Sequence, residues 1–332
     1  MAPAKRKIPR QERGAALLTV LLLVAVIAVL AATALEKLRL STRLAANLIA
    51  IDQARGYAMA AETLAVTRID TLLGRDAARV TLVGGWSGQP FRLPVPGGMA
   101  TAIVTDGGNC FNLNGLVVEN GPNSYTPRIG AIAQFTRLMQ IIGIPEQTGG
   151  GIAAATADWI DSDSTPLPNG AEDGQYSGGK IGYTTANTLI GDISELRAIA
   201  GVTPQIYAKL RPWVCAQPVA EQSRINVNTL LPEQAPLFAM LAPDRLSVEA
   251  ARAMLLDRPP QGYTSTVAFW KVAALKGVTP FPEQEAQTAI TTKWFALHID
   301  VELGGTELTQ TALIDATTRP ARLVARAWGD PA

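Results

Sequence analysis

The residues best suited to chemistry lie in an acidic segment, residues 158–176. Its five acids are Asp158, Asp161, Asp163, Glu172 and Asp173. Pro and Gly residues interrupt the segment, which indicates a loop. Closely packed carboxylates repel one another unless a cation neutralises them, and a flexible loop of oxygen ligands suits Ca²⁺. A calcium loop and a solvated acidic turn without a metal are the two interpretations that the segment leaves open.

The spacing of these acids is similar to that of an EF-hand calcium loop but does not match it. Counted from Asp161, Asp163 takes the third position and Glu172 the twelfth. Pro166 stands at the sixth position, where an EF-hand needs Gly, and Gly174 disfavours the helix that should follow. A calcium loop of another shape is therefore expected. Paired carboxylates also occur in glycosidases, but no aromatic platform for a sugar accompanies them here.

Other catalytic chemistry finds little support in the sequence. His298 is the only histidine and lies on the polar face of an expected strand, which favours a surface residue over a catalytic base. The glycines form neither a GxGxxG motif nor a P-loop, so a nucleotide site has no basis. Cys110 and Cys215 have no second Cys or His near them, which argues against zinc. We expect a protein that is not an enzyme.

Two asparagine-rich segments, residues 112–116 and 225–230, form a symmetric pair. Asn is suited to helix caps and turns, so a structural role is the first interpretation. The second segment also resembles the entry of a helix-hairpin-helix DNA-binding unit. However, Ala242-Pro243-Asp244 stands where a Gly would meet phosphate, and Asp244 would repel DNA. A membrane-anchored DNA receptor remains the main alternative, and an anchored hydrolase that uses Asp161 and Glu172 is a weaker one.

The N-terminal segment decides the class of protein. Residues 15–35 contain no charged side chain and are long enough to cross a hydrocarbon core of about 30 Å. Five basic residues and one acid give the first fourteen residues a net charge of +4, which leaves −3 for the rest of a chain whose total is +1. The basic cluster should stay cytoplasmic, which places the body in the periplasm of a bacterium. An acidic body has no electrostatic reason to bind nucleic acid.

Three interpretations of this segment compete: an uncleaved signal anchor, a secretory signal peptide cut after Ala34, and a prepilin leader cut before the apolar run. A secretory signal usually has a shorter apolar core of roughly 7–15 residues. In addition, helical periodicity continues beyond the membrane edge. Apolar residues recur at spacings of three and four at Leu40, Leu44, Leu48, Ile51, Ala54, Ala58, Ala61 and Ala65. The pattern predicts one rod of roughly fifty residues, half in lipid and half packed on a globular head.

This architecture resembles the type IV pilin and pseudopilin family, whose leader is cut after a Gly. Gly14 and Ala15 match the cleavage site, so the mature chain would begin at Ala15. The family usually carries Glu at the fifth mature position, where this chain has Thr19. In lipid a carboxylate needs a partner, which in pilins is the N-terminal amine of a neighbouring subunit. A subunit that never sits beneath such a neighbour can dispense with the acid, although Thr19 is equally compatible with an ordinary anchor residue.

The remaining pattern predicts an α+β chain with a type IV pilin-like fold. Alternation predicts strands at residues 100–105 and 295–303, followed by a strand through residue 313 and another at 321–328. Helical periodicity dominates between them and predicts an inserted all-helical subdomain. The expected divisions are a leader (1–14), a transmembrane part (15–36), a first pilin-like part (37–126), the helical insert (127–285) and C-terminal pilin-like strands (286–332). The helices expected in the insert lie near residues 129–142, 194–200, 205–210, 232–241, 247–256 and 266–275.

The two cysteines are the only pair available in an oxidising periplasm. A disulfide from Cys110 to Cys215 is therefore predicted, which would join the first strand to the insert. Two small buried apolar residues are the competing interpretation.

The chain also resembles the protein K family of type II secretion minor pseudopilins. The resemblance covers nearly the whole chain and rests on Thr19, the Asp-Trp-Ile-Asp loop that leads to Gly-Ala-Glu-Asp, the Ile-Asn-Val-Asn-Thr segment and the helical insert. It implies a non-enzymatic subunit of the inner membrane that caps the pseudopilus tip. The implied partners are minor pseudopilins I and J, the major pseudopilin, the prepilin peptidase and the assembly platform.

The same resemblance implies Ca²⁺ at the acidic loop and N-methylation after cleavage at Gly14. The implied calcium ligands are Asp161, Asp163, Glu172 and Asp173, with Asp158 as a further candidate that a helix end could draw away.

Overall fold

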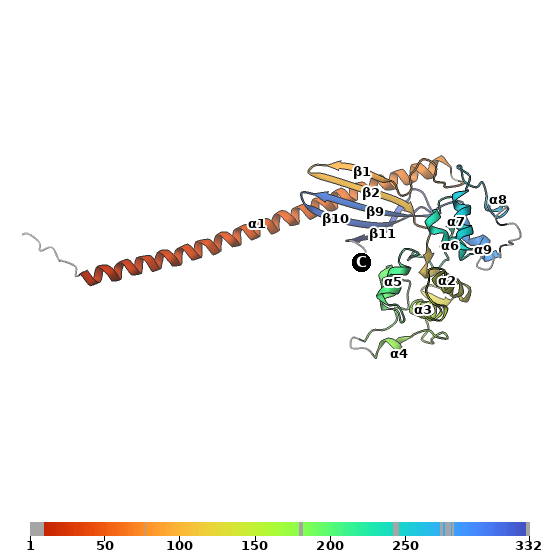
Figure 1. Cartoon of the computed structure of the whole chain (residues 1–332), viewed down its shortest axis with the longest axis horizontal. Coiled ribbons are helices and arrows are strands. Elements are labelled where there is room, and N and C mark those ends of the chain that lie inside the picture. The colour runs from red at the N-terminus through yellow and green to blue at the C-terminus, as the bar shows by residue number, and fades with distance from the viewer. Residues whose placement is uncertain are drawn as a thin grey trace, which may run out of the picture.

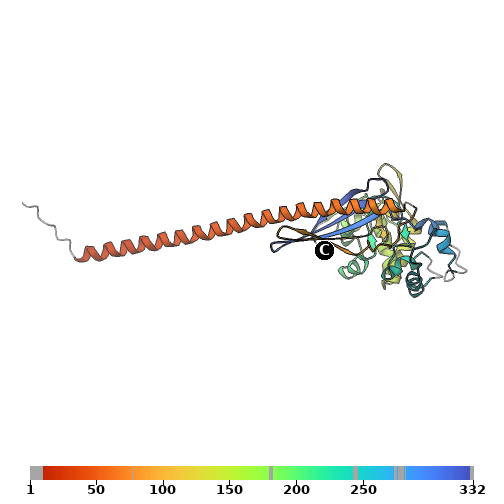
Figure 2. The same ribbon diagram turned by 90° about the horizontal axis from the view of Figure 1, so that it is seen from above.

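A single long helix dominates the molecule (Figure 1). The computed structural model describes residues 10–76, 78–178, 182–241, 246–272, 275, 280 and 282–329. Helix α1 (Arg10–Arg75) extends far beyond the head before it packs on it (Figure 2). It passes through Gly14 and Ala15 without a break, while residues 1–9 of the expected leader lie outside the described part. The rod predicted from periodicity is confirmed.

A five-stranded antiparallel sheet receives the second half of α1, in the order β1-β2-β9-β10-β11. The strands are β1 (Pro90–Val95), β2 (Gly98–Asp106), β9 (Trp294–Leu303), β10 (Thr306–Asp315) and β11 (Arg322–Trp328). Helix α1 buries a stripe of mostly small residues that let its backbone approach the sheet, from Ala54, Ala58, Ala61 and Ala65 to Ile69 and Leu73. The alternating apolar side chains of β9 form the opposite wall of this core. This arrangement is the predicted pilin-like α+β fold.

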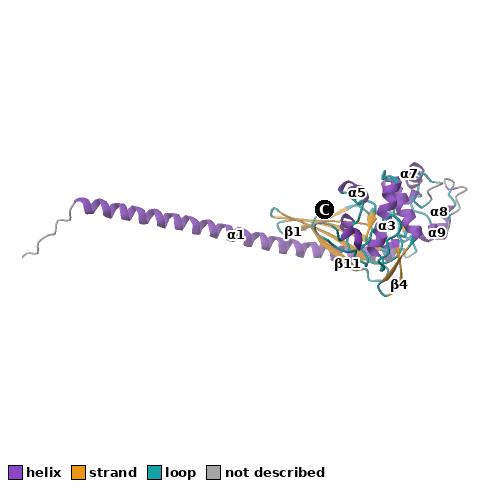
Figure 3. Ribbon diagram, turned by 90° about the horizontal axis from the view of Figure 1, so that it is seen from below, coloured by secondary structure: helices purple, strands orange, loops and turns teal. Residues whose placement is uncertain are grey.

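The sheet is interrupted between β2 and β9 by a large insert, residues 107–293, with a hydrophobic core of its own. Most of the insert lies at the end of the head far from the N-terminus of α1, and part of it lies beside the sheet (Figure 3). Its α-helices are α2 (Ile129–Ile141), α3 (Glu146–Ile160), α4 (Asp173–Tyr176), α5 (Pro204–Leu210), α6 (Ala235–Ala239), α7 (Val248–Leu256), α8 (Thr266–Trp270) and α9 (Pro282–Gln287). Among the described residues of the insert, 3₁₀ turns are found at η1 (Leu113–Leu116), η2 (Ile193–Ala198) and η3 (Pro232–Gln234).

Helix α3 was not expected, because glycines at positions 149–151 disfavour a helix. Tertiary packing overrides that preference. A Cβ atom at Gly149 would come within 3.2 Å of the Met139 side chain on α2, so the glycine permits close contact between the two helices. From Ile152 to Ile160 every residue of α3 is buried.

The expectation of an all-helical insert was wrong in one respect, because short strands divide it into two halves. Strand β3 (Phe111–Asn112) pairs in parallel with β6 (Val214–Cys215), and β7 (Ile225–Asn226) pairs in parallel with β8 (Thr288–Ala289). A hairpin of β4 (Val117–Gly121) and β5 (Ser124–Pro127) lies in the first half. The core of the insert therefore includes residues 111–125, upstream of the expected boundary at 127.

Each half begins with one of the asparagine pairs, and all four side chains are buried. The Asn112 carboxamide accepts from the backbone N–H of Gln217 and donates to two carbonyl groups, and that of Asn228 exchanges two hydrogen bonds with the backbone of Tyr263. Asn226 donates to the carbonyl of Val80, between α1 and β1, and to Thr292, just before β9, which ties the second half to the pilin-like part. The structural interpretation of these residues is confirmed, whereas the 242–244 loop of the DNA-binding alternative lies outside the described residues.

Cys110 and Cys215 form the predicted disulfide, with their Cα atoms 5.8 Å apart. The bond closes 105 residues of the first half of the insert, beside the β3–β6 pair. The expectation that it joins the first strand to the insert was wrong, because Cys110 lies beyond the end of β2 and both cysteines belong to the insert.

Candidate metal centre

The acidic segment begins inside α3 and not on a free loop. The buried face of α3 runs to its C-terminal end, so Asp158 and the cap residue Asp161 are carried into the interior with exposures of 0% and 1%. Glu172, which precedes the short helix α4, is buried as well and 7% exposed. Burial of three carboxylates in one segment is costly unless each is paired or neutralised.

Three of the five predicted ligands meet in space. Asp161, Asp163 and Glu172 each offer one carboxylate oxygen, and these atoms lie within 4.8 Å of one another. Asp161 Oδ1 and Glu172 Oε1 are fully buried and accept no hydrogen bond. Buried acceptors without a donor are rare in folded proteins and need an explanation such as an ion. The donor set, oxygen only and held partly by a loop, fits a hard divalent cation such as Ca²⁺.

The electrostatics of the group agree with this fit. Burial, followed by the negative charges of Asp163, Asp158 and Glu172, raises the pKa of the Asp161 carboxyl to about 7. Burial also raises the pKa of Glu172, which a hydrogen bond from Thr185 partly offsets. Without a cation, the surroundings of Asp161 and Glu172 thus disfavour the ionised form of their carboxyl groups. A bound cation would relieve the repulsion between these groups.

Asp158 lies beside these oxygens but is used differently. Its carboxylate accepts hydrogen bonds from the backbone N–H groups of Leu167, at 3.1 and 3.2 Å, and of Ala171, at 2.8 Å. A Cβ atom at Gly170 would lie 1.9 Å from Asp158 Oδ2, so only glycine allows the loop to close over this carboxylate. Asp158 therefore shapes the loop that returns Glu172 to Asp161.

Asp173 also stands outside the group of three. Its Oδ1 atom accepts from the backbone N–H and the hydroxyl of Thr185, each at 2.8 Å. The Thr185 hydroxyl also lies 3.2 Å from Glu172 Oε2, so this one residue orients both acids. Sequence reasoning missed Thr185, and no spacing rule connects it to the acidic segment.

Aromatic side chains and a hairpin support the loop from outside. Trp159 makes edge contacts with Tyr176 and Tyr183, and its indole N–H donates to Glu195 Oε2 at 3.3 Å. The β4–β5 hairpin is fixed to the other side, because the backbone N–H of Tyr125 donates to the Ser162 hydroxyl at 2.8 Å. The candidate site is therefore held by a packed shell.

Two other residues singled out from the sequence, His298 and Thr19, lie more than one hundred positions from the acidic segment. His298 lies half-exposed on β9 and faces Asp300 at 3.1 Å, as expected for a surface residue. Thr19 lies on the exposed part of α1, next to the turn that contains Gly14 and Ala15.

The fold defines the class of the protein: a long apolar helix packed on an antiparallel sheet is the plan of a pilin-like subunit. Among the described helices, α1 alone is long and apolar enough to cross a membrane, and none of its most apolar stretch is buried in the head. The chain is thus a single-pass, membrane-anchored protein.

Comparison with known proteins identifies the family. Models described as "Type II secretion system (T2SS), protein K" match residues 109–219 and 225–293, which are the two halves of the insert. Type II secretion system protein K of Klebsiella pneumoniae is 36% identical over 96% of this chain and 97% of its own length. The corresponding protein of Pectobacterium carotovorum subsp. carotovorum is 33% identical over the same shares.

A solved structure agrees with the sequence relatives. A chain in the crystal structure of the GspK-GspI-GspJ complex from enterotoxigenic Escherichia coli matches with a TM-score of 0.73 and 28% identity, over 84% of this chain and 96% of that chain. The chain belongs to the protein K family of the type II secretion system, and it is a minor pseudopilin of that system.

Proposed function

We propose that the chain caps the pseudopilus tip in a complex with minor pseudopilins I and J and thereby supports export of folded proteins across the outer membrane. The observation that carries this proposal is the position of the insert. Its second half, with α7, α8 and α9, occupies the end of the head opposite the membrane-spanning part of α1, where a further subunit would have to stack (Figure 1). A relative of similar fold is found in a complex with GspI and GspJ.

The fifth residue of the proposed mature chain supports the same role. Thr19 carries no carboxylate, so it cannot form an ion pair with the N-terminal amine of a neighbouring subunit. A subunit at the end of a filament needs fewer such pairs than one in the middle. The test is purification of the full chain in detergent with I and J of the same system. A defined ternary complex is expected, and a chain that stays alone or copolymerises along the filament would contradict the role.

The assembly route follows from the apolar helix. The prepilin peptidase would cut between Gly14 and Ala15 in the inner membrane, N-methylation would follow, and the body would stay in the periplasm. The assembly platform would then move α1 from lipid into contact with major and minor pseudopilins. Intact mass and N-terminal sequencing test this route: a start at Ala15 supports it, whereas an intact N-terminus or a start at Leu35 would exclude filament assembly.

For the acidic site we propose Ca²⁺ held by Asp161, Asp163 and Glu172, with Asp173 and Asp158 fixing the loop around it. A bound cation would supply the positive charge that the buried acceptors lack. Terbium is a suitable probe, because Trp159, two residues before Asp161 on α3, can sensitise its luminescence. Calcium should displace terbium, and Asp161→Asn should abolish the signal while Asp300→Asn, on the distant sheet, leaves it unchanged. Equal signals from both variants would contradict the assignment.

A further inference from the structure

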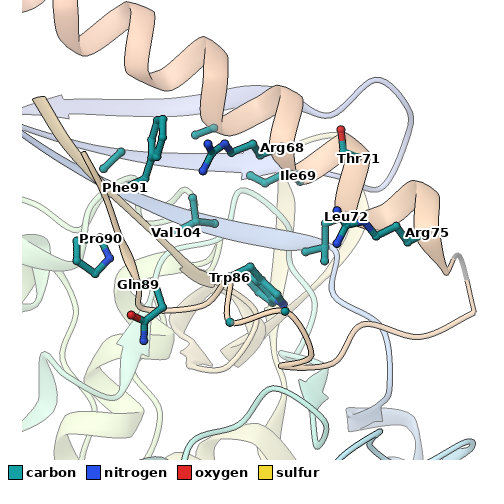
Figure 4. A pocket seen from close by; sticks show the side chains of 14 residues that line it. Arg68, Ile69, Thr71, Leu72, Arg75, Trp86, Gln89, Pro90, Phe91 and Val104 are labelled. Carbon is teal, nitrogen blue, oxygen red and sulfur yellow. The ribbon is translucent and has the colours of Figure 1, made fainter. Parts of the chain in front are cut away.

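A groove of about 400 Å³ opens where the last turns of α1 lie across the edge of the sheet (Figure 4). Helix α1 forms one wall of the groove. The other wall consists of the segment before β1, the start of β1 and the second half of β2. Ile69, Leu72, Trp86, Phe91 and Val104 give the groove an apolar lining. This groove belongs to the pilin-like part and lies apart from the acidic site.

The groove carries positive charge that the described residues leave uncompensated. Arg68 and Arg75 line it from α1, and no acid does. None of the ion pairs among the described residues includes either arginine. The acids that lie within two residues of these arginines in the sequence have other partners, since Asp70 accepts from the N–H of Ala321 and Asp76 pairs with Arg79.

The guanidinium of Arg68 is held in place without being neutralised. It stacks on the Phe91 ring with 3.6 Å between its carbon and the ring centroid. A planar guanidinium stacked in this way keeps its N–H donors directed outward in the plane, ready for a carboxylate. An apolar groove lined by two arginines, one of them stacked on Phe91, is complementary to an apolar segment that carries a carboxylate.

The position of the groove selects the source of that carboxylate. From the end of the apolar run at Glu36 to Arg68 the helix rises roughly 48 Å at 1.5 Å per residue, which places the groove too far from the bilayer for lipid headgroups. Addition of a strand to the edge of β1 is disfavoured, because Pro90 and Pro94 offer no backbone N–H. Side-chain recognition by the groove is the remaining mode.

We infer that this groove docks a segment of minor pseudopilin I or J in which an acidic residue is flanked by apolar side chains. The inference rests on the proposed complex and adds the surface and the chemistry of one contact. The arginines would pair with the acid, and the aromatic lining would bury its apolar neighbours.

Site-specific crosslinking locates the occupant. A photoreactive phenylalanine analogue placed at Gln89, on the rim of the groove, is activated in the full chain purified in detergent with I and J. Mass spectrometry should identify an acid-containing apolar segment of I or J. Crosslinks to a segment without an acid, or to a second copy of this chain, would overturn the inference.

Charge reversal then tests the recognition. Arg68→Glu combined with Arg75→Glu should weaken assembly with I and J by at least ~10-fold, whereas Arg92→Glu, on exposed β1 outside the groove, should not. Replacement of the crosslinked acid by Lys should restore assembly of the reversed variant. An unchanged affinity, or reversal without restoration, overturns the inference while the ternary complex stands. Failure of the unaltered chain to assemble would instead refute the proposed complex.

Discussion

A buried ion pair joins α1 to the sheet and allows a direct test of what fixes this helix on the sheet. Glu62 on α1 accepts two hydrogen bonds from the Arg326 guanidinium on β11, at 2.9 and 2.8 Å, and one from the Gln310 carboxamide on β10. The side chains of Glu62 and Arg326 are only 10% and 29% exposed. Removal of one partner of a buried pair leaves the other charge desolvated and unpaired, which costs roughly 3–5 kcal/mol when burial is complete.

Arg326→Ala should therefore destabilise the contact between α1 and β11 by about 2–4 kcal/mol, because water reaches Arg326 in part and Gln310 still donates to Glu62. Amide hydrogen exchange of β11 and of residues 58–66 measures this locally. Their protected amides should exchange roughly 30- to 700-fold faster, since each 1.4 kcal/mol is a factor of ten.

Two control variants separate the buried pair from charge in general. Arg252→Ala removes one partner of the exposed Arg252–Glu233 pair. It should change the exchange rates of the amides in β11 and in residues 58–66 by less than about fivefold. The double variant Glu62→Gln, Arg326→Leu removes both charges but keeps an acceptor for the Gln310 carboxamide, so it should recover most of the lost protection. Equal effects of Arg326→Ala and Arg252→Ala, or a double variant as unstable as the single one, would refute the reasoning.

Three further perturbations have definite outcomes. Gly170→Ala places a methyl group against Asp158 and should abolish terbium luminescence, whereas Gly174→Ala, which meets no atom within 4 Å, should retain it. Cys110→Ala should lower the unfolding free energy of the insert by about 3–5 kcal/mol in urea titrations under oxidising conditions, and reduction should add no further loss to that variant. Burial raises the pKa of the Asp106 carboxyl above 3.8, so its contribution to stability is lost as pH rises through the raised pKa. Asp106→Asn removes this titration, so the melting temperature should depend less on pH over that range.

Periodicity predicted the parts of this fold that depend on local pattern. The uninterrupted helix, the alternation in β9 and most helices of the insert follow from spacing alone, because the apolar residues of each recur at the period of its own backbone. Helix α3 escaped prediction because its glycines are tolerated only through the packing against α2, which lies outside any local window. Strand β1 was also missed, since its Pro90 and Pro94 are acceptable only at the sheet edge where it lies.

The candidate site was predictable as a composition but not as a geometry. Spacing pointed to five acids, yet it could not distinguish the three whose oxygens meet from Asp158 and Asp173, which are bound by backbone N–H groups. That division depends on where α3 ends and on how the loop folds over Gly170. Both are set by tertiary contacts that the sequence pattern does not contain.

The separation of the two hydrophobic cores has a consequence for assembly. One core joins α1 to the sheet, and the other fills the insert that carries the acidic site. Buried polar contacts connect them: Asp106 at the end of β2 accepts from Thr229 of the insert and from Thr292 before β9, and Asn226 reaches the carbonyl of Val80. The acidic group of Asp161, Asp163 and Glu172 takes no part in these connecting contacts. If a cation binds there, the packing of α1 on the sheet should therefore stay intact.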